Sequence, residues 1–143
     1  MAHQVSIFAE NKPGRIEKLT RLFSQASINI RAITISSANG FGVIKVLVDQ
    51  PHKAFDILRS QGIPSYLQEV IAVIMEDLPS GLHRVAQVLA ENNINIEDAY
   101  GFVVTSGKNA ILIIQVESQP RAQSVLERNN FQLLSDEEIY KYE

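Results

Sequence analysis

The tripeptide Ile28-Asn29-Ile30 recurs unchanged as Ile94-Asn95-Ile96, 66 residues further along the chain. Upstream, Pro13 and Pro79 are separated by the same distance, and the apolar positions that follow each proline also correspond. Downstream the offset becomes 68, which indicates a short insertion in a loop of the second copy, where insertions are tolerated. Self-similarity at a fixed offset is typical of a repeated supersecondary unit. The chain therefore contains two copies of one pattern.

The first copy divides into elements by its periodicity. Alternating apolar residues over 5–9 predict a strand, and the helical spacing that follows predicts a helix with Pro13 in its first turn. A second strand leads to Asn39-Gly40, a strong signal for a hairpin, and a third strand returns from it. The remaining predicted elements are a helix from Pro51, closed by Gly62, and a strand over 65–70.

The second copy repeats this order. Val73 and Met75 predict its first strand, and Pro79 lies where its first helix would start. Ser135 followed by Glu138 forms a capping box, which predicts a short terminal helix. The remaining predicted elements are a hairpin at Ser106-Gly107-Lys108-Asn109, a helix from Pro120 closed near Asn130, and a strand over 131–134.

The order βαββαβ, found twice, predicts an α+β fold. It corresponds to two ferredoxin-like units in tandem, each an antiparallel sheet with both helices on one face. We expect the units to cover residues 1–70 and 71–143, coupled rigidly because Val70-Ile71-Ala72-Val73 leaves no room for a linker. The other face of each sheet is too apolar to be left in water, so we expect a homodimer to cover it.

Composition and charge exclude several classes of function. The 143 residues contain no cysteine, which removes disulfides and thiolate metal sites. The net charge is −3, and the predicted central strands carry no aromatic residues for stacking bases, so nucleic-acid binding is not expected. The chain shows neither a signal peptide nor an apolar run of about 20 residues. We expect a cytoplasmic protein without a membrane segment.

The charge divides unevenly between the two copies. Residues 1–70 carry +3 and residues 71–143 carry −6. Such asymmetry indicates two separate units, although variation of surface residues without a function explains it equally well.

No catalytic constellation is present in the sequence. The histidines His3, His52 and His83 lack metal-binding spacing, and neither a nucleophile elbow nor a phosphate-binding loop occurs. Glu97 and Asp98 are adjacent on a predicted strand and so point to opposite faces. We expect no enzyme activity, no metal and no cofactor.

The junction between first strand and first helix is the candidate binding site in each copy. It reads Asn11-Lys12-Pro13-Gly14-Arg15-Ile16 in the first and Asp77-Leu78-Pro79-Ser80-Gly81-Leu82 in the second. A helix N-terminus suits a carboxylate, and small residues let a ligand approach the backbone. Asn29 and Asn95 offer a donor and an acceptor for the charged ends of an amino acid. Alternatively, Asn11 or Asp77 caps its helix, and the later asparagines satisfy turn backbone.

These motifs resemble the signature of the ACT domain family, whose members are small regulatory modules of amino-acid metabolism. Two segments resemble the signature Asp/Asn-x-Pro-Gly-x-Leu-x-x-Val/Leu followed by Asn-Ile at the second strand, and the match covers nearly the whole chain. They read Asn11-x-Pro13-Gly14-x-Ile16-x-x-Leu19 with Asn29-Ile30, and Asp77-x-Pro79-Ser80-Gly81-Leu82-x-x-Val85 with Asn95-Ile96. The chain is similar to stand-alone tandem ACT proteins, and this resemblance implies a free amino acid bound at an interface between ACT units. The ligand-binding residues it implies, together with the junction residues above, are Asn11, Pro13, Gly14, Arg15, Ile16, Asn29, Ile30, Asp77, Ser80, Gly81, Leu82, Asn95 and Ile96.

In serine-binding members the first signature residue and the asparagine of the second strand contact the ligand. By resemblance these are Asn11 with Asn29, and Asp77 with Asn95. A histidine that assists in such members is replaced here by Ala9 and Met75, and Ser80 replaces the signature glycine. These departures make serine a less suitable ligand, particularly in the second copy.

Two hypotheses of function remain open. In the first, the protein is non-catalytic and binds an amino acid, and it regulates a partner such as an amino-acid biosynthetic enzyme allosterically. In the second, the ACT pair is an assembly or regulatory subunit that needs no small ligand.

Overall fold

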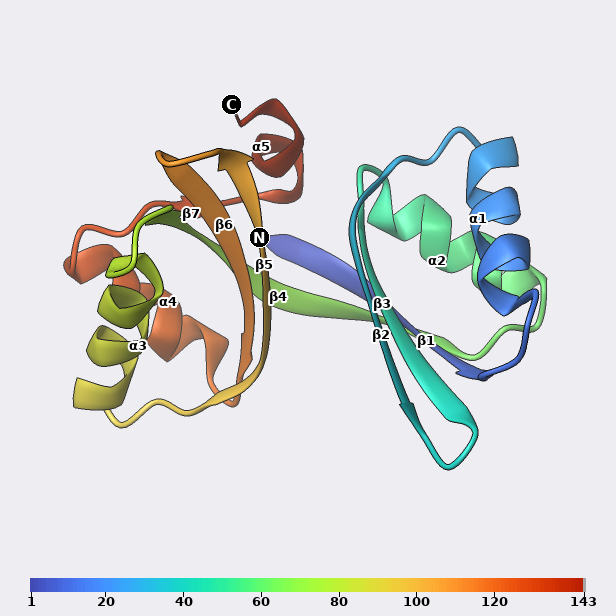
Figure 1. Ribbon diagram of the computed structural model, residues 1–143, viewed down its shortest axis with the longest axis horizontal. Helices are drawn as coiled ribbons and strands as arrows, with labels where there is room; N and C mark the ends of the chain where they lie inside the picture. The colour runs from blue at the N-terminus through green and yellow to red at the C-terminus, as the bar shows by residue number, and fades with distance from the viewer. Residues whose placement is uncertain (143) are drawn as a thin grey trace. The chain divides into compact units, whose positions relative to one another are not determined.

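The computed structural model describes residues 1–142 and contains two compact units (Figure 1). The N-terminal unit spans His3–Gln68, and the C-terminal unit comprises the chain from Glu69 onward together with Met1–Ala2. The boundary falls within strand β4 (Ser65–Glu76), so the last strand predicted for the first copy and the first strand of the second are one element.

The N-terminal unit has the predicted βαββαβ order. Its sheet order is β2-β3-β1-β4, and β3 is antiparallel to both of the strands beside it. Helices α1 and α2 lie on the same side of these strands (Figure 1). Besides the first residues of β4, the elements are β1 (Ala2–Glu10), α1 (Arg15–Gln25), β2 (Ile30–Ala38), β3 (Phe41–Val48) and α2 (Pro51–Ser60).

The C-terminal unit repeats this arrangement and adds a terminal helix. In its sheet β4 lies between β6 and β7, β5 pairs with β6, and all three pairings are antiparallel. The last strand covers two residues, fewer than predicted. Besides the rest of β4, the elements are α3 (Gly81–Glu91), β5 (Ile96–Thr105), β6 (Asn109–Val116), α4 (Gln119–Arg128), β7 (Leu133–Leu134) and α5 (Asp136–Lys141).

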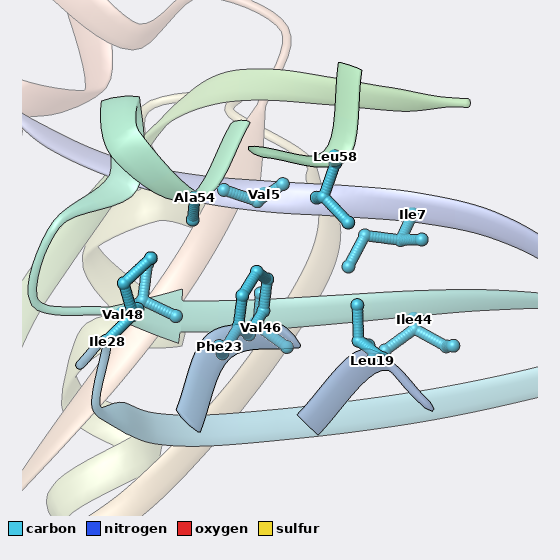
Figure 2. Close-up of a cluster of buried hydrophobic side chains, with 10 residues drawn as sticks. All are labelled: Val5, Ile7, Leu19, Phe23, Ile28, Ile44, Val46, Val48, Ala54 and Leu58. Carbon is cyan, nitrogen blue, oxygen red and sulfur yellow. The ribbon is translucent and has the colours of Figure 1, made fainter. Parts of the chain in front are cut away.

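The core of the N-terminal unit lies between its sheet and its two helices. Val5 on β1 is directly opposite Val46 on β3, and Phe23 from α1 is fully buried against this face. Figure 2 shows side chains from both helices pointing toward the strands. Burial of side chains of this size stabilises the fold by about 1.5–3 kcal/mol each. The buried residues of this cluster are Val5, Ile7, Leu19, Phe23, Ile28, Ile44, Val46, Val48, Ala54 and Leu58.

The core of the C-terminal unit repeats the first one position by position. Every buried residue of its cluster corresponds to one in the first, at an offset of 66 before the hairpin and 68 after it. The two additional residues lie where the sequence predicted an insertion, since β5 is one residue longer than β2 and its turn has one residue more. The buried residues of this cluster are Ile71, Val73, Val85, Leu89, Leu112, Ile114, Val116, Ala122 and Leu126.

The helix boundaries correct one prediction and confirm others. Pro13 and Pro79 do not occupy the first helical turn, because α1 begins at Arg15 and α3 at Gly81, and each proline lies in the preceding turn. Helix α2 begins at Pro51 as predicted.

The backbone closes two helices as the sequence predicted. Gly62 follows α2 with φ 69°, and Asn130 follows α4 with φ 66°. The capping box of α5 is also present, with Glu138 N–H donating to Ser135 Oγ at 3.3 Å and Ser135 N–H donating to Glu138 Oε1 at 3.1 Å. Over residues 1–142, no helix has the length and apolar character needed to cross a membrane.

Candidate functional site

The two strand–helix junctions share one hydrogen-bonding role that the sequence did not reveal. Asn11 Nδ2 donates to Ser37 Oγ at 3.0 Å, and Gly107 N–H donates to Asp77 Oδ2 at 2.7 Å. The backbone N–H of each also donates to a carbonyl of the same hairpin, at 2.8 Å for Asn11 and 3.1 Å for Asp77. Neither residue caps its helix, and no side chain caps α1 or α3. The capping alternative for these two residues is therefore wrong.

The N-terminal junction is open and positively charged. Gly14 adopts φ 91°, a left-handed conformation that favours glycine, and its α-carbon faces open space. Lys12 Nζ lies 2.6 Å from Glu10 Oε2, and this hydrogen bond and its charge lower the pKa of Glu10 below the ordinary 4.5. Arg15 lines a small cavity of about 60 Å³ together with Lys18. The carboxylate of Glu10 at this junction is therefore already paired with Lys12.

The C-terminal junction is tighter and adjoins a larger hollow. A Cβ on Gly81 would lie 1.8 Å from the carbonyl oxygen of Glu76, so only glycine allows α3 to begin this close to β4. Gly81 lines a hollow of about 260 Å³, which also contains the charged residues Glu76, Arg84 and Lys108. The sequence placed Gly81 among the candidate residues but did not single out its charged neighbours.

The two asparagines of the repeated tripeptide lie at the other end of each unit. Asn29 precedes β2, where its N–H donates to Asp49 Oδ1 at 3.0 Å, and Asp49 N–H donates back to its carbonyl at 3.1 Å. Asn29 and Ile30 line a hollow of about 440 Å³ with the end of α1. Asn95 is exposed before β5.

The register separates the candidate residues of each unit. Glu10 at the end of β1 is level with Ala38 at the end of β2, since both pair with Phe41. Ile30 lies eight residues back along β2, a distance of about 26 Å at about 3.3 Å per residue. Asn11 and Asn29 therefore lie at opposite ends of the unit. A small ligand that touches both must take them from different ACT units.

The C-terminal unit shows the same separation. Glu76 pairs with Asn109, which pairs with Thr105 at the far end of β5 from Asn95. Asp77 and Asn95 are thus no closer than their counterparts in the first copy.

The other candidate residues divide between core and surface. Ile16 and Ile30 pack against the first core and Ile96 packs against the second. Leu82 is exposed at 51% of its surface. Pro13, Gly14, Arg15 and Ser80 are also exposed.

Two histidines come together that the sequence did not connect. The rings of His3 and His52 lie 5.3 Å apart, centroid to centroid. Within residues 1–142, no group of three or more His, Cys, Asp or Glu side chains is placed to hold a metal ion.

The fold and the two junctions show the class of protein to which this chain belongs. The chain is a tandem of two ferredoxin-like units with matching cores and matching strand–helix junctions. A family model described as an ACT domain pair matches residues 1–142, so the chain belongs to the ACT domain pair family. ACT domains are regulatory modules, which agrees with the resemblance seen in the two signature motifs.

Solved structures include several with this arrangement. A protein from Bacteroides thetaiotaomicron is similar at 28% identity with a TM-score of 0.91, over 98% of this chain and 96% of that chain. The ligand-free regulatory subunit of aspartate kinase from Thermus thermophilus shares the fold at 19% identity and a TM-score of 0.64, over 89% and 91%. The corresponding subunit from Thermus flavus shares the fold at 18% identity with a TM-score of 0.57, over 90% of this chain and 92% of that chain. No curated protein matches the sequence significantly.

Proposed function

We propose that this protein is a non-catalytic regulatory protein of amino-acid metabolism that binds a free amino acid. Membership of the ACT domain pair family supports the regulatory role. The observation that carries the binding role is that hollows lie at the candidate residues. Asn29 and Ile30 line one of about 440 Å³, and Gly81 lines another of about 260 Å³. Each has room for a molecule of amino-acid size.

The separation of Asn11 from Asn29 suggests how such a ligand would control the assembly of the protein. An amino acid that contacts both residues bridges ACT units of two protomers, with its carboxylate at the helix N-terminus of one. Occupancy then shifts the assembly equilibrium by the difference in affinity between the assembled and free forms. The regulated partner in this proposal is an amino-acid biosynthetic enzyme, by analogy with the aspartate kinase regulatory subunits that share the fold.

A second candidate is an assembly subunit that works without a small ligand. The sheet face of the N-terminal unit that points away from its helices carries three partly or largely exposed aromatic residues, Phe8, Phe41 and Tyr66. Exposed apolar patches of this kind indicate protein–protein contact. In either case we propose a homodimer, with this face covered by a second copy.

Thermal unfolding of the full chain tests the binding role. The midpoint is measured with each of the twenty amino acids at millimolar concentration, and at least one is expected to raise it. A ligand at 100 times its Kd stabilises the native state by about 2.7 kcal/mol. No shift with any amino acid would refute the ligand-binding proposal and leave the assembly subunit.

Variants then test the residues. Asn11→Ala and Asn29→Ala are each expected to abolish the shift, because each removes one side of the bridge. Gln61→Ala is the control, since it removes an exposed amide at the end of α2 that lines neither the cavity at Arg15 nor the hollow at Asn29. A full shift retained in both asparagine variants contradicts the bridging site.

A further inference from the structure

The hollow of the C-terminal unit lies wholly within that unit. Its volume is about 260 Å³, just below the range of about 300–1,000 Å³ that is typical of sites for drug-sized ligands. It is therefore suited to a ligand of amino-acid size. The walls come from the end of β4, the start of α3, the β5–β6 hairpin and the segment that precedes β7, and the residues that matter below are Glu76, Gly81, Arg84, Lys108, Phe131 and Gln132.

Opposite charges lie side by side in the lining of this hollow. Arg84 Nη1 lies 3.8 Å from Glu76 Oε1, and the two side chains are 55% and 54% exposed. This distance exceeds that of a hydrogen bond, so the groups attract one another while their hydrogen-bonding atoms stay available to a ligand. Lys108 from the hairpin provides a second cation. A free amino acid carries the complementary pair, an ammonium and a carboxylate.

An aromatic ring supports the guanidinium. The Arg84 guanidinium carbon lies 5.7 Å from the ring centroid of Phe131, which is within the range of a cation–π contact. The N–H groups of a guanidinium lie in its plane and form a rigid fork, which matches the two oxygens of a carboxylate. The segment around Phe131 is held in turn, because Ile74 N–H donates to the carbonyl of Gln132 at 3.0 Å.

The glycine at the start of α3 places this arginine beside the acid. Because Gly81 has no Cβ, the helix begins in contact with the carbonyl of Glu76. Arg84 follows three residues later, which places it on the same face of the helix one turn along. The short distance between Arg84 and Glu76 is thus a consequence of this close approach.

The first copy lacks this arrangement. The counterparts of Glu76, Gly81, Arg84 and Phe131 are Glu10, Arg15, Lys18 and Ile63. The cavity at these positions is about 60 Å³, and Glu10 is already bonded to Lys12 at 2.6 Å. No aromatic ring stands at position 63 to support Lys18. The charge pair is therefore a property of the C-terminal unit.

We propose that the C-terminal unit binds one free amino acid in this hollow. Arg84, assisted by Lys108, holds the ligand's carboxylate, and Glu76 holds its ammonium group. This inference rests on the proposed amino-acid binding, but it places a ligand within one unit and away from Asn95. The two ACT units are accordingly unequal, and only the second carries a site of this kind.

Calorimetric titration of the full chain tests the proposal. Each of the twenty amino acids is titrated into the wild type, and the tightest is then titrated into Glu76→Gln and Arg84→Gln. Both variants are expected to raise Kd at least tenfold. The matched controls are Glu17→Gln and Arg21→Gln, which make the same charge changes in an exposed pair on α1 with a separation of 3.1 Å. The controls are expected to stay within about twofold, as surface pairs contribute little.

Modified ligands distinguish direct contact from a general charge effect. The N-acetyl derivative lacks the ammonium, so it is expected to bind wild type weakly and to lose nothing further in Glu76→Gln. The carboxamide derivative is expected to behave in the same way with Arg84→Gln. Such non-additive losses are the signature of a direct pair.

Amide resonances of the wild type locate the ligand without any variant. The N–H signals of Gly81 and Lys108 are expected to shift on titration, whereas those of Arg15 and Gly40, their counterparts in the first copy, stay in place. Shifts confined to Asn11 and Asn29, with unchanged Kd in Glu76→Gln and Arg84→Gln, would overturn this site and leave the proposed function standing. Absence of binding by every amino acid would overturn both.

Discussion

Asn11 and Asp77 occupy the same position in the two copies and secure the same hairpin with different atoms. The amide of Asn11 donates to a serine hydroxyl, whereas the carboxylate of Asp77 accepts from the N–H of Gly107. The difference explains why the signature tolerates either residue here. Both side chains are occupied in holding the hairpin against the junction, so a ligand role for either must be added to this structural one.

Gly81 is the residue whose replacement has the clearest steric cost. We expect Gly81→Ala to lower the free energy of unfolding by at least about 2 kcal/mol, because the new Cβ would meet the Glu76 carbonyl oxygen at 1.8 Å. Chemical denaturation followed by circular dichroism measures the change.

Gly42→Ala serves as the matched control for that substitution. Its Cβ would meet no atom closer than 3.5 Å, and its φ is not left-handed. We expect a change within about 1 kcal/mol, since alanine is at least as suitable as glycine in a strand. Equal losses of unfolding free energy in the two variants would show that the close approach of Gly81 to the Glu76 carbonyl is not the reason that position 81 requires glycine.

Helix α5 illustrates how a short element depends on its cap. The side chain and backbone of Ser135 hydrogen bond to Glu138, and these bonds lower the pKa of the Glu138 carboxyl below its ordinary 4.5. A lowered pKa means that the folded state favours the carboxylate. The contribution is therefore complete at pH values above 4.5 and is lost as the pH falls through the lower folded value.

Ser135→Ala tests this cap. We expect a loss of about 1 kcal/mol in the free energy of unfolding at neutral pH, as for other N-cap serines. The pKa of Glu138, followed by carbon NMR, is expected to return toward 4.5 in the variant. Ser124→Ala, on the exposed side of α4, is the control and leaves both quantities unchanged. A Glu138 pKa that is unchanged in Ser135→Ala would contradict a contribution from the Ser135 side chain, since the backbone N–H of residue 135 still donates in this variant.

At the scale of the whole molecule, the exposed aromatic face of the N-terminal unit is the feature that bears on assembly. Phe41 and Tyr66 are 68% and 63% exposed, and Phe8 packs edge-on against Tyr66 with ring centroids 5.6 Å apart. Phe8 and Phe41, together with Val43 and Pro64, line a groove of about 520 Å³. An apolar surface of this kind favours association.

Phe41→Asp tests whether this face joins two copies. We expect it to shift the proposed dimer toward monomer in sedimentation equilibrium, since it places a charge on the apolar patch. Val103→Asp, at a residue 53% exposed on β5, makes the same change outside the patch and is expected to leave the dimer intact. An unchanged dimer in Phe41→Asp would show that the face serves another purpose.

Much of the fold follows from periodicity alone. The offsets of 66 and 68 predict the repeated elements, and the two buried clusters then correspond position by position. Local signals such as the capping box at Ser135 and the turn at Gly62 are equally readable, because they involve residues close in sequence. The helix starts were predicted less well, since the turns containing Pro13 and Pro79 continue for a further residue before the helices begin.

The sequence by itself therefore determined the repeat, the βαββαβ order, the cores and the family, because each depends on local pattern. Only the tertiary structure decided which candidate residues meet. Register places Asn11 and Asn29 at opposite ends of a unit. The approach of α3 to β4 at Gly81, and the pairing of β7 with β4, bring Glu76, Arg84 and Phe131 to one hollow. The β4–β7 pairing joins segments far apart in the chain, and the turn from β4 into α3 depends on backbone conformation at Gly81, so spacing along the chain encodes neither contact.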